Sequence, residues 1–251
     1  MGWPMPSVWL WILLAQERIN MDVGASNEHT RTAWVKRVLS ETPAGLRILD
    51  AGAGELQYKK FCTHLDYVSQ DFGLYDGRGD ARGLQMGSWD QSQIDIICDI
   101  TDIPEPAESF DAVMCIEVLE HLSDPPAALR ELSRVLKTGG MLIVTAPFCA
   151  LTHFSPHFYC TGFSSNFYTH WLRELGYELL ELDYNGNYFE YLAQELRRLP
   201  WVGSEYTSTR ASWRERKAMK TVLHFLERLS QNDTGSRELL NYGLHVRAQK
   251  Q

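Results

Sequence analysis

The sequence has few cysteines, no extended basic region and no apolar run long enough to cross a membrane. Its five cysteines, at positions 62, 98, 115, 149 and 160, include no CxxC pair, and two of them lie in apolar segments, as reduced core cysteines do. We therefore expect a reducing, cytoplasmic environment. The formal net charge is −8, and the largest basic cluster is the short run 214–220, so a partner as rich in phosphate as a nucleic acid is not expected.

The apolar stretch at residues 8–15 is far shorter than the roughly 20 residues of a membrane-spanning helix. No basic segment precedes it and no small-residue cleavage signature follows it, which argues against a secretory signal. Three interpretations remain open: a lid helix, an interfacial anchor that gives weak membrane association, or a start placed too early, with Met21 the true start. We expect residues 1–27 to form a loose extension.

The remainder, residues 28–251, predicts a single α/β domain, because a chain of this length and 44% hydrophobic composition buries one good core. Helical periodicity alternates with short apolar runs that predict strands, at 46–50, 67–70, 94–98, 111–116, 141–146 and 177–182. This alternation is typical of a doubly wound sheet with right-handed connections. Residues 187–231 predict two helices, an insertion at about 187–232 that would form a cap. Strict alternation over 240–248 then predicts a last strand with one polar face.

The segment ILDAGAGE, residues 48–55, predicts a strand, a tight turn and the start of a helix. Gly52 and Gly54 allow positive φ and the close approach of a ligand, with backbone N–H groups pointing outward. A dinucleotide-binding turn has the pattern G-x-G-x-x-G, but its third glycine position holds Gln57. Asp50, directly before the turn, would repel a pyrophosphate and suits a cationic ligand.

This D-x-G-x-G pattern after an apolar strand resembles motif I of the class I S-adenosylmethionine (SAM)-dependent methyltransferases, although Leu56 stands where that family often has a third glycine. The string FDAVMCIEVLEHL, residues 110–122, is similar to the type 11 branch of the family and is the more specific signal. The resemblance covers about residues 28–186 and 238–248. It implies a Rossmann-like, doubly wound, seven-stranded sheet whose last strand runs antiparallel between the fifth and sixth strands.

The resemblance also implies where SAM would bind. Asp71 follows Asp50 by 21 residues, close to the spacing at which nucleotide-binding α/β folds place an acid that holds ribose hydroxyls. In the family, an acid after the third strand accepts from the adenine amino group, and the backbone of the fourth strand lies along SAM. The expected cofactor-binding residues are therefore Asp50, Ala51, Gly52, Gly54, Asp71, Asp99, Ile100, Cys115 and Ile116.

The segment after Pro147 is rich in aromatic residues and histidine and predicts an acceptor pocket at the carboxyl edge of the sheet. His121, His153 and His157 are candidates for a general base, which is needed only if the acceptor must lose a proton. Glu117, Glu120 and His121 resemble the E-x-x-E-H metal pattern of small-RNA 2′-O-methyltransferases and some quinone-pathway O-methyltransferases, with His157 as a fourth ligand and Mg²⁺ as the ion. The same string is also similar to type 11 enzymes without a metal, so both interpretations stay open.

The predicted function is methyl transfer from SAM to a small-molecule acceptor, with O-methylation favoured. The segment HFSPHFY, residues 153–159, resembles glycan-associated relatives, which makes a saccharide or lipid-linked acceptor an option. One alternative is a non-catalytic SAM-binding module, which the intact acids at Asp50, Asp71 and Asp99 disfavour. Another is an NAD-dependent oxidoreductase, which Gln57 and Asp50 disfavour.

Overall fold

The computed structural model describes residues 22–251, so the interpretations of residues 1–21 lie outside the described residues. The described chain divides into two compact units. The larger unit contains residues 31–183 and 243–251, and the smaller contains residues 22–30 and 184–242.

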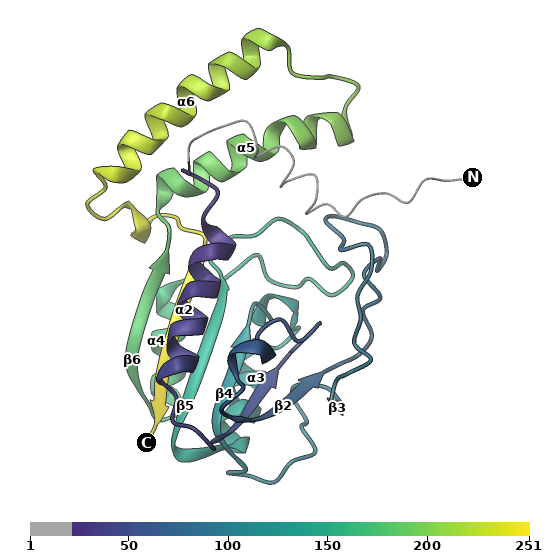
Figure 1. Cartoon of the computed structure of the whole chain (residues 1–251), viewed down its shortest axis with the longest axis vertical. Coiled ribbons are helices and arrows are strands. Elements are labelled where there is room, and N and C mark those ends of the chain that lie inside the picture. Colours follow the sequence, from purple (N-terminus) through teal and green to yellow (C-terminus); the bar gives the residue numbers. More distant parts are fainter. Residues whose placement is uncertain (1–21) are drawn as a thin grey trace. The chain divides into compact units, whose positions relative to one another are not determined.

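The larger unit is built on a seven-stranded sheet with the strand order β3-β2-β1-β4-β5-β7-β6 (Figure 1). Strands β1, β2, β3, β4 and β5 pair in parallel, and β7 pairs antiparallel with β5. The placement of β7 between β5 and β6 confirms the predicted fold. The strands are β1 Arg47–Ala51, β2 Asp66–Asp71, β3 Ile96–Ile97, β4 Phe110–Ile116, β5 Leu136–Pro147, β6 Tyr177–Asn185 and β7 Gly243–Lys250.

Helix α2 (Asn27–Glu41) lies along the sheet in Figure 1. Its apolar residues recur at helical spacing, and Trp34, Val35, Val38 and Leu39 are buried on a core formed by side chains of β1, β4 and β5. Helix α3 (Pro125–Val135) begins after Asp124, whose side chain accepts from the N–H of Ala127 at 3.0 Å. Helix α4 (Ser165–Glu174) precedes β6.

Three local predictions for this unit were wrong. No α-helix follows the glycine turn: residues 56–65 form turns joined by i→i+3 hydrogen bonds, including the short 3-10 helix η1 (Lys59–Phe61). Strand β3 has two residues rather than five. The strand predicted at 141–146 begins earlier, at Leu136, because the chain pairs with β4 from that residue onward.

The last strand was also expected to have one polar face, but His245 on that face is only 3% exposed. The reason is its central position, since a strand between two neighbours is covered on both sides by packed helices. The His245 ring stacks on the indole of Trp34 from α2, with ring centroids 5.0 Å apart.

The smaller unit contains the two helices expected in the insertion, α5 (Tyr188–Tyr206) and α6 (Trp213–Gln231), and the 3-10 helix η3 (Ser236–Glu238). Asn187 caps α5, and Ser212 with Glu215 forms a capping box on α6. Pro200 lies inside α5 and does not end it. The core of this unit contains Val23, Ala193, Leu223 and Leu226. No helix among residues 22–251 is both long and apolar enough to span a bilayer.

Candidate active site at the carboxyl edge of the sheet

The turn after β1 has no space for a side chain at either glycine. Gly52 and Gly54 have φ values of +77° and +53°, a region that side-chain-bearing residues rarely adopt. A Cβ atom on Gly52 would lie 2.4 Å from Cγ2 of Val118, and one on Gly54 would lie 2.6 Å from the indole of Trp89. The turn is therefore packed directly against two other segments.

The backbone N–H groups of this turn are already engaged within the protein. Those of Gly52 and Ala53 donate to the carbonyl of Gln70 at 2.8 and 2.9 Å, and that of Gly54 donates to Oδ2 of Asp71 at 2.9 Å. The expectation of outward-pointing N–H groups was wrong, because no α-helix begins here. A pyrophosphate needs such donors, so the turn does not suit a dinucleotide.

Asp50 ends β1 as a buried carboxyl group, 2% exposed. The hydroxyl of Tyr67 donates to its Oδ2 at 2.6 Å. Burial raises the pKa of Asp50 to about 7, the Tyr67 hydrogen bond opposes this shift, and the charge of Asp71 adds to it. A cation placed beside Asp50 would stabilise its ionised form, and this fits the ammonium group of SAM.

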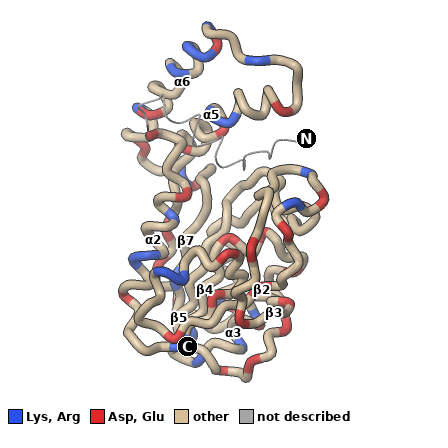
Figure 2. Tube along the Cα trace, turned by 45° about the vertical axis from the view of Figure 1, so that its right-hand side comes forward, with Lys and Arg blue, Asp and Glu red and all other residues tan. Residues whose placement is uncertain are grey.

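Asp71 ends β2 and is 5% exposed. Besides the N–H of Gly54, it accepts from the N–H of Gly73 at 3.1 Å and from Nε2 of Gln91 at 2.6 Å, both at Oδ1. Asp71 and the glycine turn thus form one hydrogen-bonded unit at the carboxyl edge, and the predicted role of Asp71 in holding ribose hydroxyls stays a prediction. Figure 2 shows acidic residues gathered at the carboxyl ends of the central strands.

The other predicted cofactor residues follow β3 and β4. Asp99 is exposed and accepts from the N–H and hydroxyl of Thr101 at 2.8 and 2.7 Å, while Ile100 beside it is buried. Cys115 and Ile116 end β4 with buried side chains, so a ligand would contact their backbone rather than their side chains. Their roles in binding SAM stay predictions.

The four predicted metal ligands are not brought together. Glu117 has φ +56°, and its side chain contacts other residues. It forms an ion pair with Arg31 at 3.1 Å and accepts a hydrogen bond from the hydroxyl of Thr145 at 2.8 Å. The ring of His157 packs edge-on against Phe72, with centroids 4.9 Å apart. Glu117 and Glu120 thus do not share one helical turn, since Leu119–His121 is a short 3-10 helix, η2.

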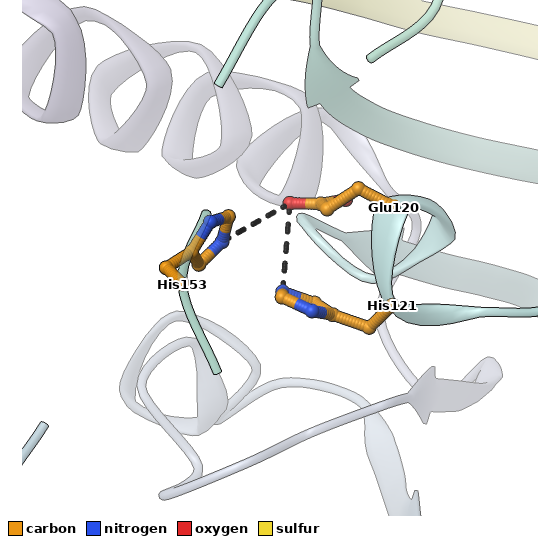
Figure 3. A group of neighbouring side chains, drawn as sticks. All are labelled: Glu120, His121 and His153. Atoms are coloured by element: carbon orange, nitrogen blue, oxygen red, sulfur yellow. Dashed lines mark ion pairs between the residues drawn. The ribbon is translucent and has the colours of Figure 1, made fainter. Parts of the chain in front are cut away.

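Glu120 and His121 are joined instead by His153, from the segment after β5 (Figure 3). Nε2 of His121 lies 3.7 Å from Oε1 of Glu120, and Nε2 of His153 lies 3.9 Å from the same oxygen. Glu120 is 1% exposed. Its burial and the charge of Glu117 raise its pKa well above the ordinary value.

Both histidines have a defined tautomer. Nδ1 of His121 lies 2.6 Å from the carbonyl oxygen of His157, and Nδ1 of His153 lies 2.8 Å from that of Leu151. A carbonyl only accepts, so each Nδ1 carries the hydrogen and each Nε2 presents a lone pair toward Glu120. Burial is the main cause that lowers the pKa of His121 to about 3, so this imidazole is neutral at physiological pH.

Two loops cover this edge and are hydrogen-bonded to each other. Leu84 forms a parallel β-bridge with His153, and its N–H and carbonyl bond the carbonyl of Thr152 at 2.9 Å and the N–H of Phe154 at 3.0 Å. The ring of Phe154 stacks on Tyr75, with centroids 4.2 Å apart, and meets Trp89 edge-on at 5.1 Å. The loop of residues 73–93 is therefore an ordered wall of the site.

Sequence reasoning missed several residues of this site, among them Tyr67, Trp89, Gln91 and Arg31. Tyr67 faces Asp50 because β1 and β2 pair in parallel, with Ile48 opposite Tyr67; the pairing register was the only signal that could have found it. Trp89 and Gln91 lie in a glycine-rich loop without periodicity, where sequence gives no direction to a side chain.

The family model described as a methyltransferase domain matches residues 49–144. A ubiquinone biosynthesis O-methyltransferase of Xanthomonas axonopodis pv. citri is 33% identical over 110 residues, which are 41% of this chain and 44% of that protein. A demethylmenaquinone methyltransferase of Renibacterium salmoninarum is 35% identical over 116 residues, which are 44% of this chain and 46% of that protein. The chain thus matches a little under half the length of these curated relatives.

Among solved structures, a protein of Galdieria sulphuraria named as a methyltransferase superposes with a TM-score of 0.54 at 16% identity, over 88% of this chain and 85% of that chain. An identity this low shows the fold alone. Support for a family comes from the match at residues 49–144. This segment includes the glycine turn, Asp71, Asp99 and the Glu120–His121 pair. Together these findings support the class I SAM-dependent methyltransferase family that the sequence predicted.

Proposed function

We propose that this protein transfers the methyl group of SAM to an oxygen atom of a small-molecule acceptor. The observation that carries the proposal is the hydrogen-bonded unit of Gly54 and Asp71 beside the buried Asp50. It offers two carboxyl groups and no unoccupied N–H at Gly52, Ala53 or Gly54, which suits a cationic nucleoside and not a pyrophosphate.

Asp50 would hold the ammonium end of the cofactor, and Asp71 would hold its ribose hydroxyls. Asp99 and Ile100 would contact the adenine, and the backbone at Cys115 and Ile116 would line the path between them. When bound, SAM supplies an electrophilic methyl group on a sulfonium. The protein's part in such a displacement is chiefly to align the acceptor atom with that methyl group.

Aromatic and imidazole groups at the same edge support a small, flat acceptor. The ring of His153 lies 4.9 Å from that of Phe158, and the ring of His121 lies 4.9 Å from that of Phe154. A hydroxyl acceptor must lose a proton, and His121 with its low pKa is a poor base. His153, with 23% of its side chain exposed, is the better candidate to receive the proton. Neither His121 nor His153 needs the imidazole of His157 to act as the base, although the main-chain carbonyl of His157 orients the His121 ring.

The names of the relatives favour a quinone precursor, which carries phenolic hydroxyls, over the saccharide or lipid-linked acceptor that the segment 153–159 suggested. The acceptor is therefore best sought first among phenols. Amines and sugar hydroxyls come next, because the displacement itself does not distinguish oxygen from nitrogen.

Titration calorimetry with SAM, its demethylated product and NAD tests the cofactor. We expect SAM and its product to bind and NAD not to bind. Asp71→Ala should weaken both ligands by about 10-fold to 150-fold, because each hydrogen bond to a charged group contributes about 1.5–3 kcal/mol. Asp66→Ala is the matched control, since this exposed acid begins the same strand.

A screen with methyl-labelled SAM against phenols, sugars and amines tests the transfer. Label on a phenol supports the proposal. SAM binding without transfer to any acceptor class would favour the non-catalytic module, and NAD binding without SAM binding would favour the oxidoreductase.

A further inference from the structure

The three side chains Glu120, His121 and His153, here called the edge triad, converge on one point without hydrogen-bonding to each other. The two distances from imidazole Nε2 to Oε1 of Glu120, 3.7 and 3.9 Å, exceed the range of a hydrogen bond. All three ligand atoms lie within 4.8 Å of one another. Ligands that share one Zn²⁺ at about 2.0–2.1 Å lie roughly 3.3 Å apart in a tetrahedral site. The two separations from Glu120 exceed that value by roughly half an ångström, and the separation of the two imidazole nitrogens exceeds it by at most about 1.5 Å, so side-chain adjustments would bring the three atoms into coordination range.

Glu120 supplies an independent observation. Its second carboxylate oxygen, Oε2, is buried and accepts no hydrogen bond from any residue in 22–251. The nearby Glu117 is already paired with Arg31. A buried carboxyl group with an unsatisfied oxygen is costly unless a cation or a donor compensates it.

The backbone around the triad holds the ligands in place. Each histidine donates its Nδ1 hydrogen to a main-chain carbonyl, an arrangement typical of metal-ligating imidazoles, because it fixes the tautomer and aims the other nitrogen. The carbonyl of Glu120 accepts from the N–H groups of Tyr159 and Cys160 at 2.9 and 3.1 Å. The segment 153–160 is thereby held against residues 120–121.

We propose that the edge triad binds one first-row transition-metal dication, such as Zn²⁺ or Mn²⁺, through Nε2 of His121, Nε2 of His153 and the carboxylate of Glu120. Two imidazoles and one carboxylate are a poor donor set for Mg²⁺, which prefers oxygen, and a good one for these ions. The set differs from the E-x-x-E-H interpretation in its residues, since His153 replaces Glu117 and His157, and in the class of metal. Three protein ligands leave a coordination position for an oxygen ligand.

The inference goes beyond the proposed function, and methyl transfer itself does not depend on it. A metal bound to Nε2 of His153 would occupy the lone pair that would otherwise accept the acceptor's proton, so His153 serves either as the base or as a ligand. It is tested on the full chain, stripped with a chelator and dialysed, by calorimetric titration with Zn²⁺, Mn²⁺ and Mg²⁺ and by visible spectroscopy with Co²⁺. We expect one equivalent of Zn²⁺ to bind, Mg²⁺ to bind far more weakly, and Co²⁺ to give the ligand-field bands of a nitrogen- and oxygen-bound ion.

Variants separate the triad from other histidines. Mutation of a residue that only hydrogen-bonds to a metal ligand typically lowers metal affinity by about 10-fold to 100-fold. Removal of a ligand itself should have a larger effect, so His153→Ala and Glu120→Gln should each lower Zn²⁺ affinity by at least about 100-fold. His157→Ala is the matched control: it deletes a neighbouring imidazole but keeps the carbonyl that orients His121. It should change the affinity by no more than about twofold.

His153→Gln, judged folded by its circular dichroism and thermal midpoint, guards against loss through misfolding. The proposal is overturned by any of three results: no stoichiometric Zn²⁺ binding by the wild type, unchanged Zn²⁺ affinity in folded His153→Ala or His153→Gln, or a loss in His157→Ala as large as that in His153→Ala. Because metal binding is read without SAM, its failure leaves the proposed methyl transfer untouched, and the reverse also holds.

Discussion

Nε2 of Gln91 donates a hydrogen bond of 2.6 Å to Oδ1 of Asp71, the carboxyl group expected to hold the ribose of SAM. Two residues earlier, the indole of Trp89 lies 2.6 Å from the position that a Cβ atom on Gly54 would take. The N–H of Asp90 between them donates to the side chain of Glu55 at 2.9 Å. Residues 89–91 thus lie directly on the turn to which the cofactor would bind.

The Gln91 contact leads to a prediction about SAM affinity. Asp71 accepts three hydrogen bonds, and a carboxylate has about four lone-pair sites, so a ribose with two hydroxyls must displace Gln91. Gln91→Ala removes the side chain that competes with the ribose hydroxyls for Asp71, and a hydrogen bond of this kind contributes about 0.5–1.5 kcal/mol net. Calorimetry should therefore show that SAM binds about 2-fold to 10-fold more tightly to this variant. Gln91→Glu should weaken SAM by placing a like charge beside Asp71.

Gln93→Ala serves as the matched control, because this neighbouring glutamine is exposed. If Gln91→Ala instead weakens SAM binding by tenfold or more, Gln91 contacts the cofactor itself and the competition argument fails.

The contrast between Asp71 and the edge triad shows what the sequence could predict. Asp50, the glycines and Asp71 follow from local patterns, since an apolar run ends at each acid and parallel strands meet at one edge. The third member of the triad does not, because His153 reaches Glu120 only through its loop's pairing with Leu84, 69 residues earlier by number. Glu117 could not be placed either, since its positive φ turns it toward Arg31 and no local pattern encodes that turn.

A second prediction concerns Asp50 and the pH dependence of SAM binding. Its pKa is raised to about 7, so the carboxyl group is mostly protonated in the unliganded protein below that pH. If the ionised form binds the ammonium group, SAM affinity should fall by about tenfold per pH unit below pH 7 and level off above it. Asp50→Asn should bind SAM weakly at all pH values and flatten the profile. An unchanged profile in Asp50→Asn would assign the titration to another group.

A third prediction concerns the core of the smaller unit. Leu223 of α6 is 2% exposed and packs with Val23, Ala193 and Leu226. Leu223→Ala leaves a cavity and should lower the free energy of unfolding by about 2–5 kcal/mol in urea denaturation. The neighbouring Val222 is 45% exposed, and Val222→Ala should cost less than about 0.5 kcal/mol. Equal losses in the two variants would show that α6 does not pack as described.

The last prediction uses His245 of β7, whose ring stacks on Trp34 and whose Nε2 has no hydrogen-bond partner among the described residues. Burial is the main cause that lowers its pKa to about 4. Because the folded pKa is depressed below the ordinary 6.5, the unfolded state binds the proton first as pH falls. His245 therefore favours the folded state fully above about pH 6.5, and this contribution is lost progressively down to about pH 4. The shift corresponds to a loss on the order of 3 kcal/mol in the free energy of unfolding.

Urea denaturation at several pH values should show this loss, and His245→Leu, which cannot take up a proton, should have a shallower decline over the same window. His224→Leu is the control, because this exposed histidine of α6 should leave the wild-type slope in place. A decline as steep in His245→Leu as in the wild type would assign the acid sensitivity to other groups, of which the partly buried His121 is the first to test.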